Sequence, residues 1–213
     1  MLDMLFPPRC VLCDTAAGPL CSSCGASFRP PPEMPLPPGV DHLIALCDYE
    51  GAGRDLVLAL KRANRRVAIP LVAGALATGV APTVRLAGER SRPLAVTWAP
   101  TTAQRRRSRG YDQSELVARE LARRLGAGCG RLLQRRSGAL EGASRAQRVD
   151  GVRFVATVAV PPRVMVVDDV VTSGATMSAA AAALRAAGST EVIAVALARA
   201  RSRGDRTAGR QAS

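Results

Sequence analysis

Aromatic residues are scarce in this chain of 213 residues, since Phe, Trp and Tyr make up only 3% of it while 47% of its residues are hydrophobic. A core must therefore be filled mostly by Ala, Val and Leu, and a surface that stacks nucleic-acid bases is poorly supplied. No uncharged apolar run long enough for a membrane span is expected, and the N-terminus lacks the basic and apolar parts of a secretory leader. We therefore expect a folded chain located in the cytoplasm.

Lysine and histidine are almost absent. Lys61 is the only lysine among the 30 Lys and Arg residues, and His42 is the only histidine. The formal charge of +13 can indicate an anionic partner such as nucleic acid. A general bias toward Arg and Ala accounts for much of this charge, but Arg is concentrated at residues 105–109 and 199–210. A solvated surface is the favoured interpretation of the second concentration, and direct nucleic-acid binding stays open. The single His is expected to be a surface or packing residue rather than a catalyst.

Cysteine is infrequent but patterned. Two C-x2-C pairs are separated by seven residues and consist of Cys10, Cys13, Cys21 and Cys24. Each pair can present two thiolates from a tight turn, so the two pairs predict a tetrahedral structural zinc site with no open position. Two disulfides or free thiols are the alternative, which a chain without a secretory leader disfavours. Because so short a segment buries little apolar surface, the metal is expected to supply much of its folding free energy.

The remaining pattern predicts an α/β fold with a small N-terminal module. Six prolines between Arg29 and Gly39 exclude regular structure and predict an extended linker. Beyond them, short apolar runs alternate with helical patterns, which indicates a parallel sheet flanked by helices. The expected division is a zinc module at 1–29, a linker at 30–40, an α/β domain at 41–200 and a disordered Arg-rich tail at 201–213. Strands are expected at 43–49, 94–98, 164–167 and 191–197, and helices at 54–62, 69–78, 112–125 and 176–187.

Residues 164–176 carry the most specific pattern, a buried strand followed by an acidic pair, a hydroxyl-rich loop and a helix. Ligands of parallel sheets bind at the carboxyl ends of strands. The first N–H groups of the helix and the loop hydroxyls can cradle a phosphate, and Gly174 allows close backbone approach. Two carboxylates beside a phosphate suit the hydroxyls of a ribose and the positive charge that develops as its anomeric bond breaks. A turn and a helix cap are the plain alternative, but a cap does not require both carboxylates.

These residues resemble the signature loop of the type I phosphoribosyltransferases, which bind phosphoribosyl pyrophosphate (PRPP). The resemblance implies that Asp168 and Asp169 are catalytic residues that hold the ribose hydroxyls. It further implies a 5′-phosphate site formed by Thr172, Ser173, Gly174, Ala175 and Thr176.

Further motifs resemble the ComF (competence protein F) family: residues 5–10 with the cysteine pairs, residues 49–61, and residues 109–113. This resemblance implies a double zinc-ribbon-like head on a type I phosphoribosyltransferase-like domain, a pyrophosphate loop at 98–102, and a flexible hood at 141–153. Guanidinium groups bind phosphate oxygens bidentately, so the arginines after the loop have a use there, although surface solvation remains the alternative. The further candidates for PRPP contacts are Thr101, Arg105, Arg106 and the single lysine, Lys61. Asp112 stands where the family usually has Asn, and residues 98–100 also depart from its pattern.

The sequence leaves two functions open. The first is a phosphoribosyltransferase, a pentosyl-transferring enzyme of nucleotide metabolism that uses Mg2+ with PRPP, carries structural Zn2+, and transfers ribose 5-phosphate to a nitrogenous acceptor. The second is a non-catalytic PRPP or nucleotide sensor, or an adaptor of a DNA-uptake machinery with a protein partner in competence. No motif identifies the acceptor or the oligomeric state.

Overall fold

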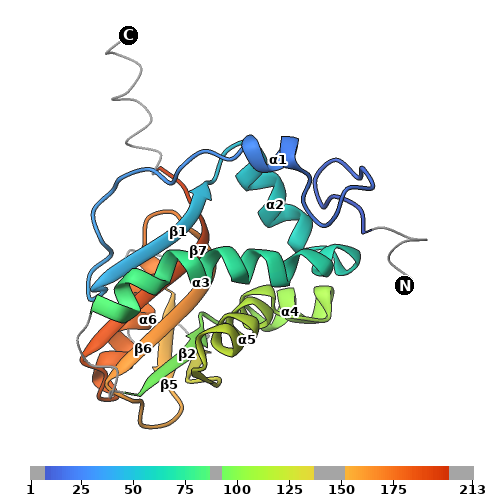
Figure 1. Cartoon of the computed structure of the whole chain (residues 1–213). Coiled ribbons are helices and arrows are strands. Elements are labelled where there is room, and N and C mark those ends of the chain that lie inside the picture. Colours follow the sequence, from blue (N-terminus) through green and yellow to red (C-terminus); the bar gives the residue numbers. More distant parts are fainter. Residues whose placement is uncertain (1–7, 87–92, 137–151, 202–213) are drawn as a thin grey trace, which may run out of the picture.

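The computed structural model describes residues 8–86, 93–136 and 152–201, and its centre is a parallel sheet of five strands (Figure 1). The strand order is β1-β7-β6-β2-β3, and every neighbouring pair runs parallel. The strands are β1 (His42–Asp48), β2 (Leu94–Trp98), β3 (Gly128–Cys129), β6 (Arg163–Val171) and β7 (Glu191–Arg199). A separate antiparallel pair is formed by β4 (Leu133–Arg136) and β5 (Arg153–Ala156).

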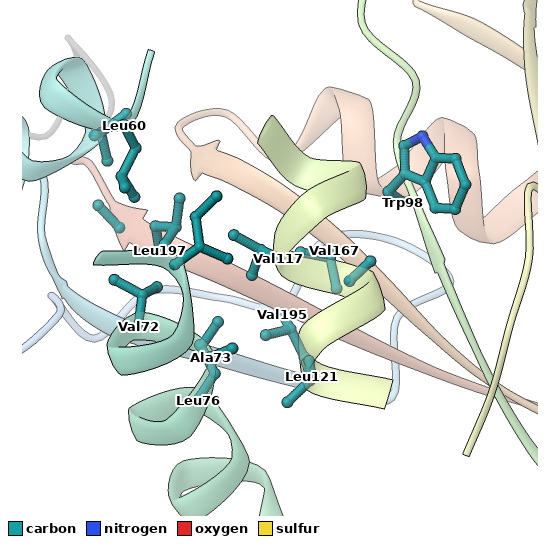
Figure 2. Packing of buried hydrophobic residues seen from close by; sticks show 14 of the residues in the cluster. Leu60, Val72, Ala73, Leu76, Trp98, Val117, Leu121, Val167, Val195 and Leu197 are labelled. Carbon is teal, nitrogen blue, oxygen red and sulfur yellow. The ribbon is translucent and has the colours of Figure 1, made fainter. Parts of the chain in front are cut away.

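Helices cover both faces of the sheet, which confirms the fold class that the alternating pattern predicts. One core cluster joins the sheet to the helices of one face, and Figure 2 shows Val72 and Leu76 meeting Val117 and Leu121 over Val195. The second cluster lies on the other face, beneath α6 and the β4–β5 pair. The helices are α1 (Ser22–Ala26), α2 (Ala52–Leu60), α3 (Ile69–Leu86), α4 (Ala103–Arg109), α5 (Gln113–Leu125) and α6 (Ala175–Ala186), with a 3-10 helix η2 (Ala63–Ala68) between α2 and α3.

Most expected elements lie within one or two residues of their predicted bounds, but two are longer. Helix α3 continues to Leu86 instead of ending at residue 78, and β6 is longer than the strand expected at 164–167. Its pairing with β7 continues through Val170↔Ala198 and Val171↔Arg199. The acidic pair therefore belongs to the strand instead of following it. Backbone pairing with β7 holds both carboxylates more rigidly than a loop would.

The expectation that no apolar run could span a membrane is wrong by length and composition. Residues 67–84 contain no charged side chain, and the helical stretch Arg65–Val84 has a mean hydropathy of 1.8. One face of this stretch is nevertheless core: Val72, Ala73, Leu76 and Val80 are buried against the sheet and α5. A core helix of a soluble fold passes the same test, so this stretch is weak evidence for a membrane span.

The Pro-rich segment is free of helix and strand, but it lies against the domain instead of acting as a free spacer. Arg199 Nη2 donates to the carbonyl oxygens of Met34 (3.0 Å) and Pro35 (2.7 Å). Pro37 is buried beside Gly174, where an added Cβ would lie 2.8 Å from the proline Cγ. The segment therefore packs against the loop that follows β6.

Gly53 in α2 is the glycine with the closest backbone approach, because an added Cβ would overlap the carbonyl oxygen of Asp48 and lie 2.8 Å from Cys47 Sγ. A backbone oxygen cannot rotate away, so we predict that Gly53→Ala lowers the free energy of unfolding by about 3 kcal/mol, measured by urea denaturation. Gly130→Ala is the matched control, since a Cβ there meets no atom within 4 Å. A Gly53→Ala protein as stable as the control would contradict the packing of α2 on the end of β1.

Candidate functional site

The candidate site lies where β6 passes into α6. Gly174 adopts a left-handed conformation (φ 78°) at the start of α6, and no side chain caps the helix there. Ser173 Oγ makes one weak contact, at 3.4 Å from the N–H of Ala175. Because the first N–H groups of a helix lack partners within it, this terminus is suited to an anion such as a phosphate. Of the predicted phosphate-loop residues, Gly174 is buried, Thr176 is half-buried, and Thr172, Ser173 and Ala175 are exposed.

The two carboxylates have different surroundings. Asp168 Oδ1 accepts the backbone N–H of Asp169 at 2.8 Å. Burial, the neighbouring charge of Asp169 and the more distant charge of Asp112 raise the pKa of the Asp168 carboxyl well above its ordinary value. A proton, or a cation that replaces it, therefore stabilises this pair. Two adjacent carboxylates offer oxygen ligands of the kind that bind Mg2+ together with substrate phosphates.

Asp169 receives two donors from distant parts of the chain. Lys61 Nζ, just beyond the end of α2, lies 2.9 Å from Asp169 Oδ2. Gln113 Nε2, in the first residue of α5, donates to the same oxygen at 3.2 Å. The structure thus brings the predicted residues Lys61 and Asp169 together and adds Gln113, to which the sequence interpretation gave no role. Its place in the 109–113 motif was the available signal. Gln113 Oε1 is buried without a hydrogen-bond partner among the described residues.

Asp112 holds the loop after β2 against the start of α5. One of its oxygens accepts the N–H of Thr101 (2.9 Å), and the other accepts the N–H of Ser114 (3.1 Å) as the N-cap of α5. Burial raises the pKa of the Asp112 carboxyl, and these N–H groups oppose the rise. The residue that departs from the family pattern is therefore buried and bonds to the backbone.

The structure does not bring all the predicted PRPP contacts to the acidic pair. Arg105 and Arg106 lie on α4, a helix that the sequence interpretation did not predict, and both are exposed. Arg106 Nη2 lies 3.8 Å from Glu115 Oε2. In the described part of the chain, no hydrogen bond or ion pair joins Arg105 or Arg106 to Asp168 or Asp169. The expected hood lies almost wholly at residues 137–151, outside the described residues, as does the tail beyond residue 201.

A second candidate site is the cysteine cluster. The sulfur atoms of Cys10, Cys13, Cys21 and Cys24 all lie within 4.8 Å of one another, and all four cysteines are free rather than disulfide-bonded. Four convergent thiols with no other ligand type match a structural zinc site. Burial opposes ionisation of Cys10, but backbone hydrogen bonds lower the pKa of its thiol to about 6. Interaction with the other thiols, Cys21 first, raises the pKa of Cys24 to about 12, so a cation is needed before all four can ionise.

The two remaining cysteines are placed as packing residues. Cys47 is buried, and its Sγ donates to the carbonyl oxygen of Leu197 at 3.4 Å. Cys129 is half-buried in β3. Burial raises the pKa of the Cys47 thiol to about 11 and also raises that of Cys129, so neither is an activated nucleophile.

Comparison with known proteins supports the resemblance to phosphoribosyltransferases. Residues 160–209 match the phosphoribosyl transferase domain. These 50 of the 213 residues are similar to that family. The matched segment contains β6, the acidic pair, the loop and α6, which together form the first candidate site. A crystal structure of a hypoxanthine phosphoribosyltransferase from Staphylococcus aureus is similar at 14% identity and a TM-score of 0.39, over 62% of each chain. The chain thus spans 62% of the length of that protein. No curated protein matches the sequence.

Proposed function

We propose that this protein binds PRPP together with Mg2+ and transfers its ribose 5-phosphate to a nitrogenous acceptor, releasing pyrophosphate. The observation that carries the proposal is the pair Asp168 and Asp169, which residues 170–174 separate from the uncapped start of α6, within the segment that matches the domain. A ribose and its 5′-phosphate are adjacent in PRPP, as these two binding elements are in the chain. Zn2+ is proposed as the structural ion of the cysteine cluster.

Each part of PRPP has a proposed binding element. The 5′-phosphate lies against the first N–H groups of α6 and the hydroxyls of the loop before it. The ribose hydroxyls donate to the carboxylates of Asp168 and Asp169. The pyrophosphate lies toward the loop that Asp112 anchors through Thr101, and the ammonium of Lys61, which pairs with Asp169, is the cation proposed to meet it.

The proposed transfer breaks the bond between the anomeric carbon and pyrophosphate, whose oxygen leaves with the electron pair. The lone pair of the acceptor nitrogen forms the new bond to carbon, and the nitrogen releases a proton to solvent. Asp168 and Asp169 stabilise the positive charge that develops on the ribose ring, and fixed hydrogen bonds orient the sugar. Mg2+ bound with the substrate supplies neutralisation of the pyrophosphate charge.

The finer family assignment is also a proposal. The order of cysteine pairs, the 49–61 segment and the 109–113 motif supports membership of the ComF family, with a role in nucleotide metabolism or DNA uptake. A non-catalytic sensor or adaptor is the second candidate, and the exposed arginines of α4 favour it, since they are available to an anionic partner.

Pyrophosphate release separates the two candidates. We predict that the zinc-loaded protein with Mg2+ and PRPP releases pyrophosphate when one member of a panel of nitrogenous bases and amines is added. Asp169→Asn should lower the rate at least 100-fold, whereas Asp55→Asn, the same change at an exposed position on α2, should leave it unchanged. PRPP binding without release for any acceptor would favour the non-catalytic candidate.

A further inference from the structure

The four-cysteine module contacts the segment that carries Lys61. Arg65, in η2, donates from Nη1 to the backbone oxygen of Cys10 (3.2 Å) and to Asp14 Oδ1 (2.8 Å). Cys10 is one of the four clustered cysteines, and the N–H of Asp14 donates back to the same Cys10 oxygen at 3.0 Å. Arg65 therefore binds the turn that a metal at the cluster would order.

The module is packed onto the domain instead of extending from it. Val11, between the first two cysteines, is only 3% exposed and belongs to the core cluster that includes Leu56 and Leu60 of α2. Phe28 also packs against this cluster. Figure 1 shows the N-terminal module, α2 and α4 at the same end of the molecule. The orientation of the module relative to α2 is thus fixed by buried contacts.

The same segment reaches the candidate PRPP site through Lys61, and Tyr111 contacts the segment on both sides of Lys61. Tyr111 donates from its hydroxyl to the Leu60 oxygen at 2.8 Å, and the guanidinium of Arg66 lies 4.7 Å from the centre of its ring. Lys61 lies between these attachments and reaches Asp169 at 2.9 Å. Only three residues separate Lys61 from Arg65, so the conformation of the segment at one end constrains the other.

We propose that Arg65 is a positioning residue that couples the four-cysteine module to the PRPP site through Lys61. This inference rests on the proposed function. With the metal bound, the Cys10–Asp14 turn holds Arg65, and the segment keeps Lys61 in place. Without the metal, the Cys10–Asp14 turn loses the cross-link that fixes it, and the left-handed conformation of Asp14 (φ 63°) is no longer held. Arg65 then loses both of its hydrogen-bond acceptors. Zinc and PRPP consequently bind cooperatively, and each raises the affinity for the other by the same factor, about tenfold.

Calorimetric titration with PRPP and Mg2+ tests this coupling. Arg65→Ala should weaken PRPP binding about tenfold while one equivalent of zinc stays bound, and Arg65→Lys, which keeps the charge opposite Asp14, should recover part of the loss. Arg9→Ala is the matched control. Arg9 Nη1 also contacts Asp14: it donates to the Asp14 carbonyl oxygen at 2.9 Å and lies 3.6 Å from Asp14 Oδ2. Arg9 does not, however, belong to the segment that carries Lys61. Its PRPP affinity should equal that of the unsubstituted protein.

Two measurements distinguish positioning from a general loss of stability. In a Lys61→Met background, Arg65→Ala should cause no further loss of PRPP affinity, because its effect acts through Lys61. Competition with a zinc chelator should show that PRPP raises zinc affinity in the unsubstituted protein but not in Arg65→Ala. Additive losses, or equal PRPP affinity in Arg65→Ala and the unsubstituted protein, would overturn the coupling alone. Failure of the unsubstituted zinc-loaded protein to bind PRPP would overturn the proposed function and the coupling together.

Discussion

Replacing both Asp168 and Asp169 by Asn is expected to reduce PRPP affinity at least 100-fold without loss of the fold. Each carboxylate would give a charge-assisted hydrogen bond to a ribose hydroxyl, and such bonds contribute about 1.5–3 kcal/mol. Since about 1.4 kcal/mol corresponds to a factor of ten, two lost bonds exceed a factor of 100. Calorimetric titration measures the affinity, and circular dichroism checks the fold. Affinity unchanged in the double variant would reject the assignment of the acidic pair.

The stability of the Asp168→Asn protein is an internal control, because it is expected to rise while PRPP affinity falls. The pKa of Asp168 is raised in the folded chain, chiefly by burial, so the folded chain binds this proton more strongly than the unfolded chain does. Stability is therefore lost as the pH rises from the unfolded pKa through the raised folded pKa. Asn removes the buried charge, so at neutral pH the variant is expected to be the more stable protein, by about 2–4 °C in Tm for each kcal/mol gained. A fall in Tm would indicate that the carboxylate is needed by the fold instead.

Removing one ligand of the cysteine cluster has the second large expected effect. Cys10→Ser should lower zinc affinity by more than about 100-fold and unfold the module, because the metal is expected to supply much of the folding free energy of so short a segment. Val11 would then leave the core, and amide exchange across residues 10–28 should lose its protection. Native mass spectrometry reports the stoichiometry, and hydrogen exchange reports the unfolding.

Cys129→Ser is the matched control for this experiment, since Cys129 is a free, half-buried cysteine in β3, away from the cluster. It should retain one zinc and a protected module. Zinc affinity should also fall as the pH decreases, because the metal must displace protons, first from Cys24 with its raised pKa and, below about pH 6, from Cys10 as well. A module that stays protected after zinc removal would contradict the structural role of the metal.

The sequence was sufficient to predict the sheet because its apolar runs are short, separate and directly followed by helical patterns. The strand at 94–98 has the predicted bounds, and the helix expected at 112–125 is α5, which Asp112 caps. The extra length of β6 could not be predicted, because the pairing of Val170 and Val171 with β7 is a property of the neighbouring strand. The short helix α4 was missed because Arg-rich residues 105–109 carry no apolar periodicity.

The candidate site shows the same division between local and long-range information. The acidic pair and the phosphate loop are contiguous, so their spacing reveals them. Gln113, at the start of α5, and Lys61, just beyond α2, are far apart in the sequence, and only the fold shows that they contact the same oxygen of Asp169. The contact of Arg65 with Cys10 likewise crosses from one module to the other and has no sequence signature.

Calorimetric titration of the zinc-loaded protein with PRPP, in the presence and absence of Mg2+, tests the central claim most directly. We predict saturable binding of one PRPP per chain that strengthens with Mg2+ and is lost in the Asp168→Asn, Asp169→Asn double variant. No binding by the zinc-loaded, folded protein would contradict the claim, because the acidic pair and the start of α6 would then not form a PRPP site.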